Sequence, residues 1–305
     1  MTTTPPPASL RIILAAAIFL GSAAASAPGK VVLRWKFRAG EVLRYQTDQT
    51  TASKAKDPGG QEVNQTVTLT VDLAWTVKAV DPSGTATLTQ TIDRMRTTAT
   101  TPHGKMAFDS RDAAAASSPA GPIFKMLVGS EITFTMNPRG EIGDIKLSDK
   151  LLASFKGDEP AGAQGQFSEV GLKNMVAQMG VAFPEEGLDV GGTWTRKLAV
   201  PAGPDGQTRD VAQTYTFRGP APAGGIGSRI DLATRFEPIK PDPNFPVTIK
   251  AEQADGRVDF DDAKGRIEVS RITQRVDVTS RIEGKEYAMS TESVTTMTLA
   301  KDKAP

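Results

Sequence analysis

Four acidic side chains that lie close together are the first candidates for chemistry. Asp255, Asp259, Asp261 and Asp262 precede Gly265 within one short stretch. Carboxylate oxygens are the ligands that Ca²⁺ takes in proteins. The stretch lacks the twelve-residue loop that ends in Glu, and Asp is also favoured in hairpin turns. We therefore expect a hairpin loop here and no metal site.

The single histidine is the next candidate, because imidazole is the commonest acid–base catalyst. His103 lies in the turn Thr101–Gly104 and has no Ser or Asp at a fixed spacing. The chain has no cysteine, which excludes disulfides, thiolate metal sites and cysteine nucleophiles. Nucleotide-binding and Gly-x-Ser-x-Gly motifs are absent as well. We expect a non-catalytic protein with no catalytic residue and no cofactor. A hydrolase built on paired carboxylates of separated pKa is a less favoured class.

Several arginines alternate along stretches that have the pattern of strands. Side chains two residues apart in a strand share a face, so these cations could line a groove for an anionic ligand. Antiparallel sheets often expose one face to water, and we favour that simpler interpretation. The arginines are Arg94, Arg96, Arg271, Arg275 and Arg281.

A set of apolar residues forms the candidate ligand site. Helices that carry them could cover an apolar cavity, where methionine adapts to varied ligands. The alternative is that the helices simply fill the core of a sheet. On the first interpretation, the ligand is apolar or lipid-like. The candidate ligand-binding residues are Trp75, Phe124, Leu127, Leu172, Met175, Met179 and Phe183.

The elements that would position these residues follow an N-terminal targeting segment, expected at residues 1–27. Arg11 precedes the apolar run Ile12–Leu20, and small residues follow. This order is typical of a secretory signal peptide, and the run is too short to cross a bilayer, which takes about 20 residues. Ala23–Ala25 and Ala25–Ala27 are competing cleavage sites, and a retained anchor is the alternative. We expect an exported protein, periplasmic or extracellular, with no integral membrane span after cleavage.

Most of the remaining chain has the pattern of strands. In 63–79 the odd positions are apolar except for Gln65, and Asp81–Gly84 is a turn signal. A four-residue loop there pairs Val77 with Leu88 and Leu73 with Ile92, with a bulge needed beyond Ile92. Trp75 then lies near the middle of the apolar face. The pattern predicts a mainly β fold of long curved antiparallel strands, in a barrel-like or half-barrel sheet.

Helical periodicity is confined to the middle of the chain. Helices are expected at 122–128, after Ser148, and around Leu172–Met179, where apolar residues recur at helical spacing. With these two or three short helices, the mature chain is expected to have three parts. They are a first β half with short helices (28–156), a linker with an amphipathic helix (157–184) and a second β half (185–305). We expect the two halves to be similar.

An internal duplication would explain that similarity. Gly40-x-x-x-Arg44 matches Gly192-x-x-x-Arg196, and the Gly-x-x-x-Phe-Asp pattern at 104–109 recurs at 256–261, with the same offset of 152 residues. Glycine- and threonine-rich strands also resemble one another by chance, which is the alternative explanation.

The chain resembles an uncharacterised family of exported bacterial proteins, a domain of unknown function that is common in planctomycete-type bacteria. The resemblance rests on Leu33–Tyr45, on Phe108-Asp109-Ser110 and on Val190–Trp194. It implies an exported β protein and brings no catalytic residue with it. At the level of fold alone, the chain also resembles periplasmic lipoprotein carriers.

Composition and charge fit an ordinary soluble globular protein. Hydrophobic residues make up 39% and charged residues 23%, and the net charge is +1, which favours neither nucleic acid nor anionic lipid as a partner. We expect a protein that binds or carries an apolar or lipid-like ligand in the cell envelope. The alternative is a structural or interaction protein of the envelope without a small-molecule ligand. Protein partners are left open.

Overall fold

A computed structural model describes residues 29–56, 59–102, 104–112, 121–155, 168–201, 208–222, 225, 227–238, 247–282 and 285–300. The predicted signal peptide and His103 lie outside the described residues. The strands are β1 (Val42–Lys56), β2 (Glu62–Val80), β3 (Ala86–Thr101), β4 (Gly104–Asp109), β5 (Glu131–Met136), β6 (Ile142–Leu147), β7 (Thr193–Pro201), β8 (Thr208–Pro220), β9 (Ser228–Phe236), β10 (Val247–Asp261), β11 (Arg266–Ile282) and β12 (Lys285–Leu299). The helices are α1 (Gly121–Leu127), α2 (Asp149–Ser154) and α3 (Glu169–Gln178). No helix within these ranges is long and apolar enough to cross a membrane.

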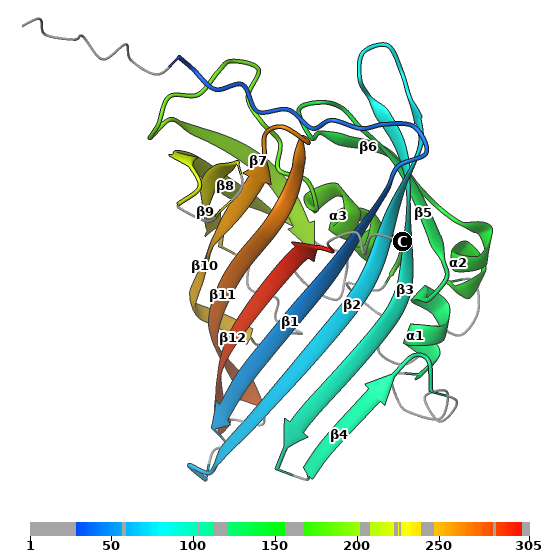
Figure 1. Cartoon of the computed structure of the whole chain (residues 1–305). Coiled ribbons are helices and arrows are strands. Elements are labelled where there is room, and N and C mark those ends of the chain that lie inside the picture. The colour runs from blue at the N-terminus through cyan, green and yellow to red at the C-terminus, as the bar shows by residue number, and fades with distance from the viewer. Residues whose placement is uncertain are drawn as a thin grey trace, which may run out of the picture.

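The described strands form one large antiparallel sheet, as the alternation predicts. Its order is β6-β5-β3-β2-β1-β12-β11-β10-β9-β8-β7, with β4 paired to β3. Each neighbour along this path is also a neighbour in sequence, apart from the pair β3 and β5 and the central pair β1 and β12. The first half of the chain therefore builds one side of the sheet and the second half builds the other (Figure 1). The sheet curls into a half-barrel and stays open between β6 and β7 along the described strands.

The β2–β3 hairpin has the register that its apolar pattern predicts. Val77 lies opposite Leu88, and Leu73 lies opposite Ile92. The expected bulge beyond Ile92 is present, because the register shifts there by one residue at Asp93. A four-residue loop without irregularity would pair Ala79 with Ala86, but a second shift at Lys78 pairs Val80 with Ala86 instead. A one-residue bulge reverses which side chains face the core, so these shifts keep the apolar face continuous.

A bulge in β11 lies elsewhere than the pattern predicts. The sequence suggests an irregularity between Val269 and Ile272, but the register shifts between Ile267 and Val269. Ile267 is 1% exposed and faces the core. The irregularity comes early because Ile267 must pack inside next to the β10–β11 turn, which returns Val269 to the opposite face.

Residues 31–38 are an extended segment that crosses the end of the sheet, and we call this segment the strap (Figure 1). Its predicted alternation is present, since Leu33 and Trp35 are each 2% exposed. It does not form a full strand: the N–H of Trp35 donates to Pro138 and that of Lys36 to Gly265, in two different turns. Gly265 has φ +64°, and a Cβ there would lie 2.5 Å from the Lys36 nitrogen. Glycine is therefore required where the strap meets this turn.

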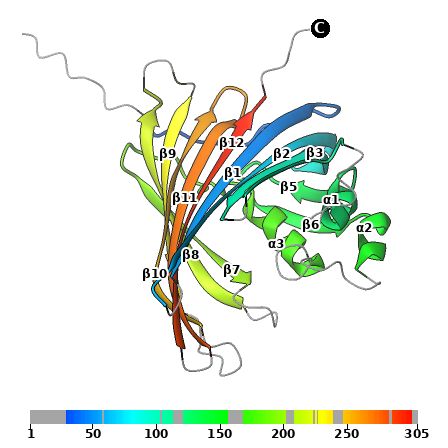
Figure 2. The same ribbon diagram turned by 90° about the horizontal axis from the view of Figure 1, so that it is seen from below.

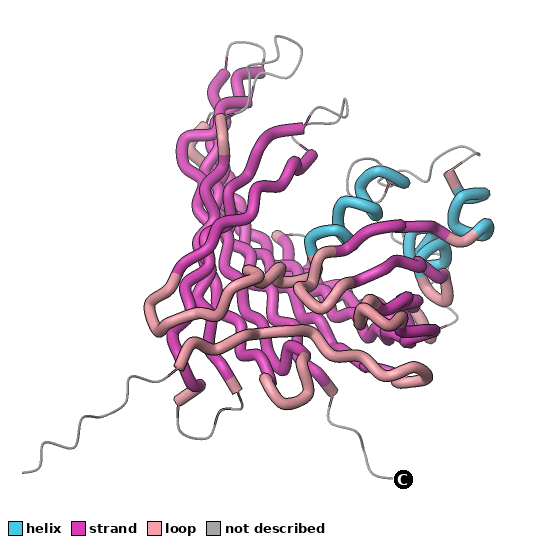
Figure 3. Tube along the Cα trace, turned by 90° about the horizontal axis from the view of Figure 1, so that it is seen from above, coloured by secondary structure: helices cyan, strands magenta, loops and turns pink. Residues whose placement is uncertain are grey.

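The three helices gather on the core side of the sheet, next to β3, β5 and β6 (Figures 2 and 3). All three occur where the periodicity predicts them. Ser168 begins α3, where its hydroxyl accepts a hydrogen bond from the Gly171 N–H. Ser148 precedes α2 without a side-chain cap.

The opening between the edge strands β6 and β7 is filled by the end of α3 and the residues that follow it. Trp194 of β7 donates its indole N–H to Ala182 (2.7 Å). Arg196 donates to the carbonyls of Ala177 (2.8 Å) and Gly180 (3.1 Å), where α3 ends. The carbonyl of Ala177 lies in the last turn of α3 and has no partner within the helix, so the bond from Arg196 satisfies it. One end of the half-barrel is thereby closed around a single core.

Candidate binding surface

The seven residues predicted to bind a ligand lie mostly in the closed core. Trp75 and Leu172 are 0% exposed, and Phe183 is 1% exposed. Phe124 and Leu127 are also buried in the same cluster, and Met179 packs against it. Met175 lies outside the cluster and is 41% exposed. The structure therefore brings six of the seven together, as the filling of the core.

Trp75 illustrates how completely this region is packed. Its ring contacts Trp35, Tyr45 and Phe134, with ring centroids 6.2, 5.2 and 5.9 Å away. Its indole N–H donates to the Gln90 side-chain oxygen at 2.9 Å. Rings in mutual contact with a satisfied polar atom are typical of a structural core. Trp75, which is 0% exposed, therefore has no face open to a ligand.

The strands continue well beyond the core. The ends of β1, β2, β11 and β12 reach further down than the helices in Figure 1 and lie apart from them in Figure 2. On β1, the face that carries Leu43 and Tyr45 continues as Thr47, Gln49 and so on, because alternate residues share a face. We call this continuation, level with residues 49–55 of β1, the lower floor.

One part of the lower floor is apolar. Val67 and Leu69 of β2 lie opposite Ala99 and Thr97 of β3, which in turn lie opposite the β4 residues Met106 and Phe108. Val63 and Met106 keep 38% and 64% of their surface exposed. We call Val63, Val67, Leu69, Ala99, Met106 and Phe108 the apolar band. Leu69 and Phe108 pack against the core, and the Phe108 ring centroid lies 4.3 Å from that of Phe124 in α1. The strongly exposed members are thus Val63 and Met106, and exposed apolar side chains on one face are typical of interaction sites.

The neighbouring part of the lower floor, on β1 and β12, is polar but uncharged, and β11 adds Gln274 between the apolar residues Ile272 and Val276. Gln49 donates to the Ser293 hydroxyl at 3.0 Å, and the Thr51 hydroxyl lies 3.1 Å from that of Ser293. The hydroxyls of Ser53 and Thr291 are 3.3 Å apart. We call Gln49, Thr51, Ser53, Thr291, Ser293 and Gln274 the polar band. It lies directly beside the apolar band, since Thr51 and Val67 are opposite each other.

A charged pair borders the polar band. Arg209 of β8 contacts both carboxylate oxygens of Glu252 of β10, at 2.5 and 2.6 Å. Gln274 donates to the same carboxylate at 3.2 Å, and the guanidinium lies 4.7 Å from the centre of the Phe236 ring. Such a bidentate ion pair neutralises both charges within the floor. Side-chain exposure is only 12% for Arg209 and 7% for Glu252.

A shallow hollow of about 330 Å³ lies at the far tip of the sheet. Most of its lining residues alternate with those of the lower floor and so belong to the opposite, convex face; they are Lys54, Lys56, Glu62, Asp277, Thr279, Ala288 and Ser290. None of the seven predicted residues is part of it. The hollow is therefore not part of the lower floor.

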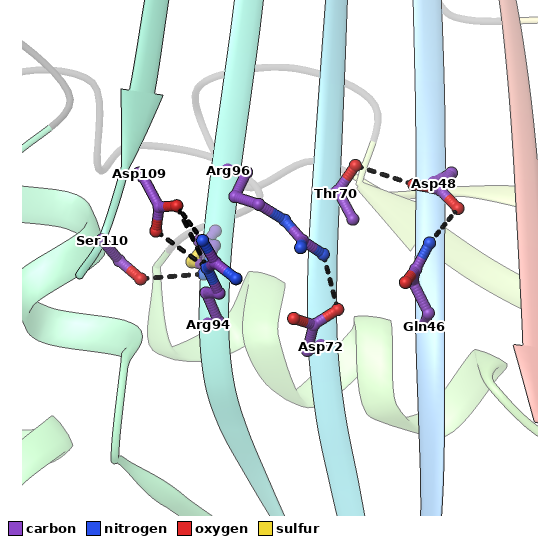
Figure 4. A network of polar contacts seen from close by, with 9 residues as sticks. Gln46, Asp48, Thr70, Asp72, Arg94, Arg96, Asp109 and Ser110 are labelled. Atoms are coloured by element: carbon purple, nitrogen blue, oxygen red, sulfur yellow. Dashed lines mark hydrogen bonds and ion pairs between the residues drawn. The ribbon is translucent and has the colours of Figure 1, made fainter. Parts of the chain in front are cut away.

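The opposite, convex face carries the arginines, and each has a partner. Arg94 forms a bidentate pair with Asp109, and Arg96 donates to Asp72 at 2.7 Å (Figure 4). On β11, Arg275 pairs with Glu292 at 2.7 Å. Opposite charges on neighbouring strands therefore balance one another, and a water-exposed sheet face, as favoured from the alternation, is what the structure contains. Hydrogen bonds from Arg94, and then from the Arg111 N–H, lower the pKa of Asp109 to about 2.

The acidic stretch forms the β10–β11 turn, as its composition predicts. Asp261 is 4% exposed, and its carboxylate accepts hydrogen bonds from the N–H groups of Ala263 and Lys264, at 3.0 and 2.9 Å. Burial acts to raise the pKa of Asp261, but these donors and the Lys264 ammonium outweigh it and lower that pKa. Among the described residues, no group of three or more His, Cys, Asp or Glu side chains could hold a metal ion.

The two bands were not recognised in the sequence, although a signal for them exists. Thr47, Gln49, Thr51 and Ser53 occupy odd positions like Tyr45, so their hydroxyl and amide side chains must share its face. On its own, such a run has the pattern of a water-exposed strand. Only the pairing of β1 with β12, at the centre of the sheet, places Ser293 and Thr291 beside it.

The fold has a recognisable counterpart among solved structures. A structure described as "Lipid-protein interactions in lipovitellin" aligns with a TM-score of 0.53 and 12% identity, over 88% of this chain and 26% of that one. This chain thus corresponds to about a quarter of that protein's length, and the likeness concerns the fold alone. DynF from Micromonospora chersina and an outer membrane channel from Pseudomonas putida F1 align with TM-scores of only 0.23 and 0.24 and 11% and 7% identity. They cover 91% and 87% of this chain and 88% and 97% of their own, but scores this low do not support a shared fold.

A search of curated proteins found no match. The comparison with family models confirms the expected resemblance to an uncharacterised family, whereas the planctomycete link and the internal duplication stay predictions. Residues 83–220, from the β2–β3 turn to the end of β8, match the model of DUF6263, a family of unknown function.

Proposed function

We propose that this chain is an exported, non-catalytic protein that binds or carries a lipid-like ligand on its lower floor. The observation that carries the proposal is the apolar band. It begins at the core, where Phe108 contacts Phe124 of α1, and continues the core face along β2 and β4, where Val63 and Met106 remain 38% and 64% exposed. Exposed apolar surface is costly in water, so an apolar ligand that covers it gains about 25 cal/mol for each Å².

Two further observations support this function. The solved structure with a similar fold is described by its lipid–protein interactions. The N-terminal run Ile12–Leu20 has the length and flanks of a secretory signal, which favours the cell envelope. In this proposal six of the seven residues that the sequence predicts to bind a ligand build the closed core instead, and the ligand lies on the lower floor.

A structural or interaction protein of the envelope is the second candidate. The filled core favours this candidate, because Trp75, Leu172 and Phe183 fill the closed end and no bound ligand is required to complete its packing. In that case, the apolar band would be covered by a protein partner and not by lipid.

Native mass spectrometry of protein purified from its own envelope fraction distinguishes the two candidates. We expect bound species of lipid mass, which organic extraction removes. In Val67→Asp the bound lipid should be lost, while Thr66→Asp, on the opposite face of the same strand, should retain it. A melting curve for each variant confirms folding. Lipid-free protein that co-purifies with a stoichiometric protein partner would overturn the carrier function.

A further inference from the structure

We infer that the ligand of the lower floor is an uncharged amphipathic lipid, with hydroxyl or ester oxygens in its head group. The inference rests on the proposed function and names the chemistry of the ligand. Its basis is the arrangement of two bands side by side, one apolar and one polar but without net charge.

The two bands match the two parts of an amphipathic lipid. Three neighbouring strands supply the apolar band, whereas β1 and β12 supply the polar band with Gln274 added by β11. Because strands lie about 4.8 Å apart, the apolar band is about 14 Å wide and the polar band about 10 Å wide, and both run along the strands for several residues. A lipid that lies across Val67 and Thr51 would bury its chain against β2–β4 and place its head group over β1 and β12.

The polar band offers hydroxyl and amide groups, which both donate and accept hydrogen bonds. Ser293 shows this capacity, since its hydroxyl contacts both Gln49 and Thr51. A hydroxyl rotates to suit its partner. The side chains of the polar band can therefore give up their hydrogen bonds to one another and bond to the hydroxyl or ester oxygens of a head group. A neutral head group can form hydrogen bonds here without any charged group being removed from water.

An anionic head group would find no free cation at this level of the floor. Among the described core-side positions level with the polar band, the cations are Arg209 and Arg196. Arg209 is neutralised by Glu252. Arg196 keeps its charge, because its partners are the neutral carbonyls of Ala177 and Gly180, but it lies on β7, five strands from β12 along the sheet. A carboxylate or phosphate would lose water there and gain only neutral donors, which is unfavourable.

The test compares two ligands that share one acyl chain: 1-oleoylglycerol, which is uncharged, and oleate, which is anionic at pH 8. With the delipidated full chain, titration calorimetry should give a dissociation constant at least about tenfold lower for 1-oleoylglycerol, because no spare cation compensates the carboxylate. The variant Glu252→Gln keeps the shape and leaves Arg209 unpaired. It should improve oleate binding about tenfold or more and change 1-oleoylglycerol binding less than about threefold.

A second variant covers the case in which Glu252→Gln does not fold. Ser293→Lys places a new cation in the centre of the polar band, at a partly exposed position, and should likewise shift the preference towards oleate. Equal binding of both ligands by the unmodified chain, or no shift in either variant, would overturn the inference and leave the proposed function intact. Binding of neither ligand would instead overturn the proposed function.

Discussion

A single charge placed at adjacent positions of β2 tests the register of the sheet. Val77 faces the core opposite Leu88 and is 1% exposed, whereas Thr76 faces the other way, between Val42 and Thr89. Val77→Asp should be strongly destabilising and Thr76→Asp mild. The two variants carry the same charge in the same strand, so a difference between them reports the face and not the charge.

The size of the effect follows from two contributions. Burial of a valine side chain is worth about 1.5–3 kcal/mol, and that contribution is lost. The new carboxyl has no partner, so its pKa must rise from about 3.9 to above 7 for it to stay neutral, which costs about 4 kcal/mol at pH 7. The sum of about 6 kcal/mol is comparable to the whole stability of many domains. Thr76→Asp should cost about 1 kcal/mol, the range of strand propensities.

Urea unfolding at pH 7 and pH 5 is the assay. A buried carboxyl with a raised pKa destabilises the folded state more as the pH rises. The difference in free energy of unfolding between the two variants should therefore narrow by about 2.7 kcal/mol from pH 7 to pH 5. If Val77→Asp does not fold at pH 7, the measurement at pH 5 alone shows which of the two variants is less stable. Equal destabilisation by the two substitutions would refute the register, and with it the assignment of the lower floor to the core-side face.

Three further predictions concern single polar contacts. Asp109→Asn should flatten the pH dependence of the melting temperature between about pH 4 and 2, because a lowered folded-state pKa contributes stability that disappears only as the pH falls through that range; an unchanged slope would contradict it. Arg196→Gln should cost about 1–3 kcal/mol, since the carbonyls of Ala177 and Gly180 lose their donor, and should speed hydrogen exchange in α3 more than in β1. Millimolar Ca²⁺ should leave the melting temperature unchanged, because the Asp261 carboxylate already accepts two backbone N–H groups; a large rise that Asp261→Asn abolishes would show a metal site.

Much of the fold is predictable from local pattern. The hairpin pairs Val77 with Leu88 because apolar residues alternate on both sides of a strong turn, and this information lies within a few residues of Gly84. The helix around Leu172 is predictable for the same reason, since its period of 3.6 is visible in ten residues. The bulge at Asp93, which has no partner residue on β2, is predictable because the apolar alternation of β3 breaks there.

The parts that could not be predicted depend on long-range contacts. The strap alternates like a strand, but its partners Pro138 and Gly265 lie in turns more than a hundred residues away. The pairing of β1 with β12 joins the two ends of the chain and creates the polar band, which neither strand indicates alone. The candidate ligand residues were chosen for their apolar character, and apolar residues at helical spacing serve equally well to fill a core.

The lower floor as the lipid site is the central claim, and photo-crosslinking tests it most directly. An acyl chain with a terminal diazirine, attached either to glycerol or to a carboxylate, can be bound to the full chain, activated by light and mapped by peptide mass spectrometry. We expect adducts on residues of the apolar band, such as Val67 and Met106, from at least one of the two probes. Adducts confined to the convex face or to the helices, or no labelling above that of the heat-unfolded chain, would contradict the claim.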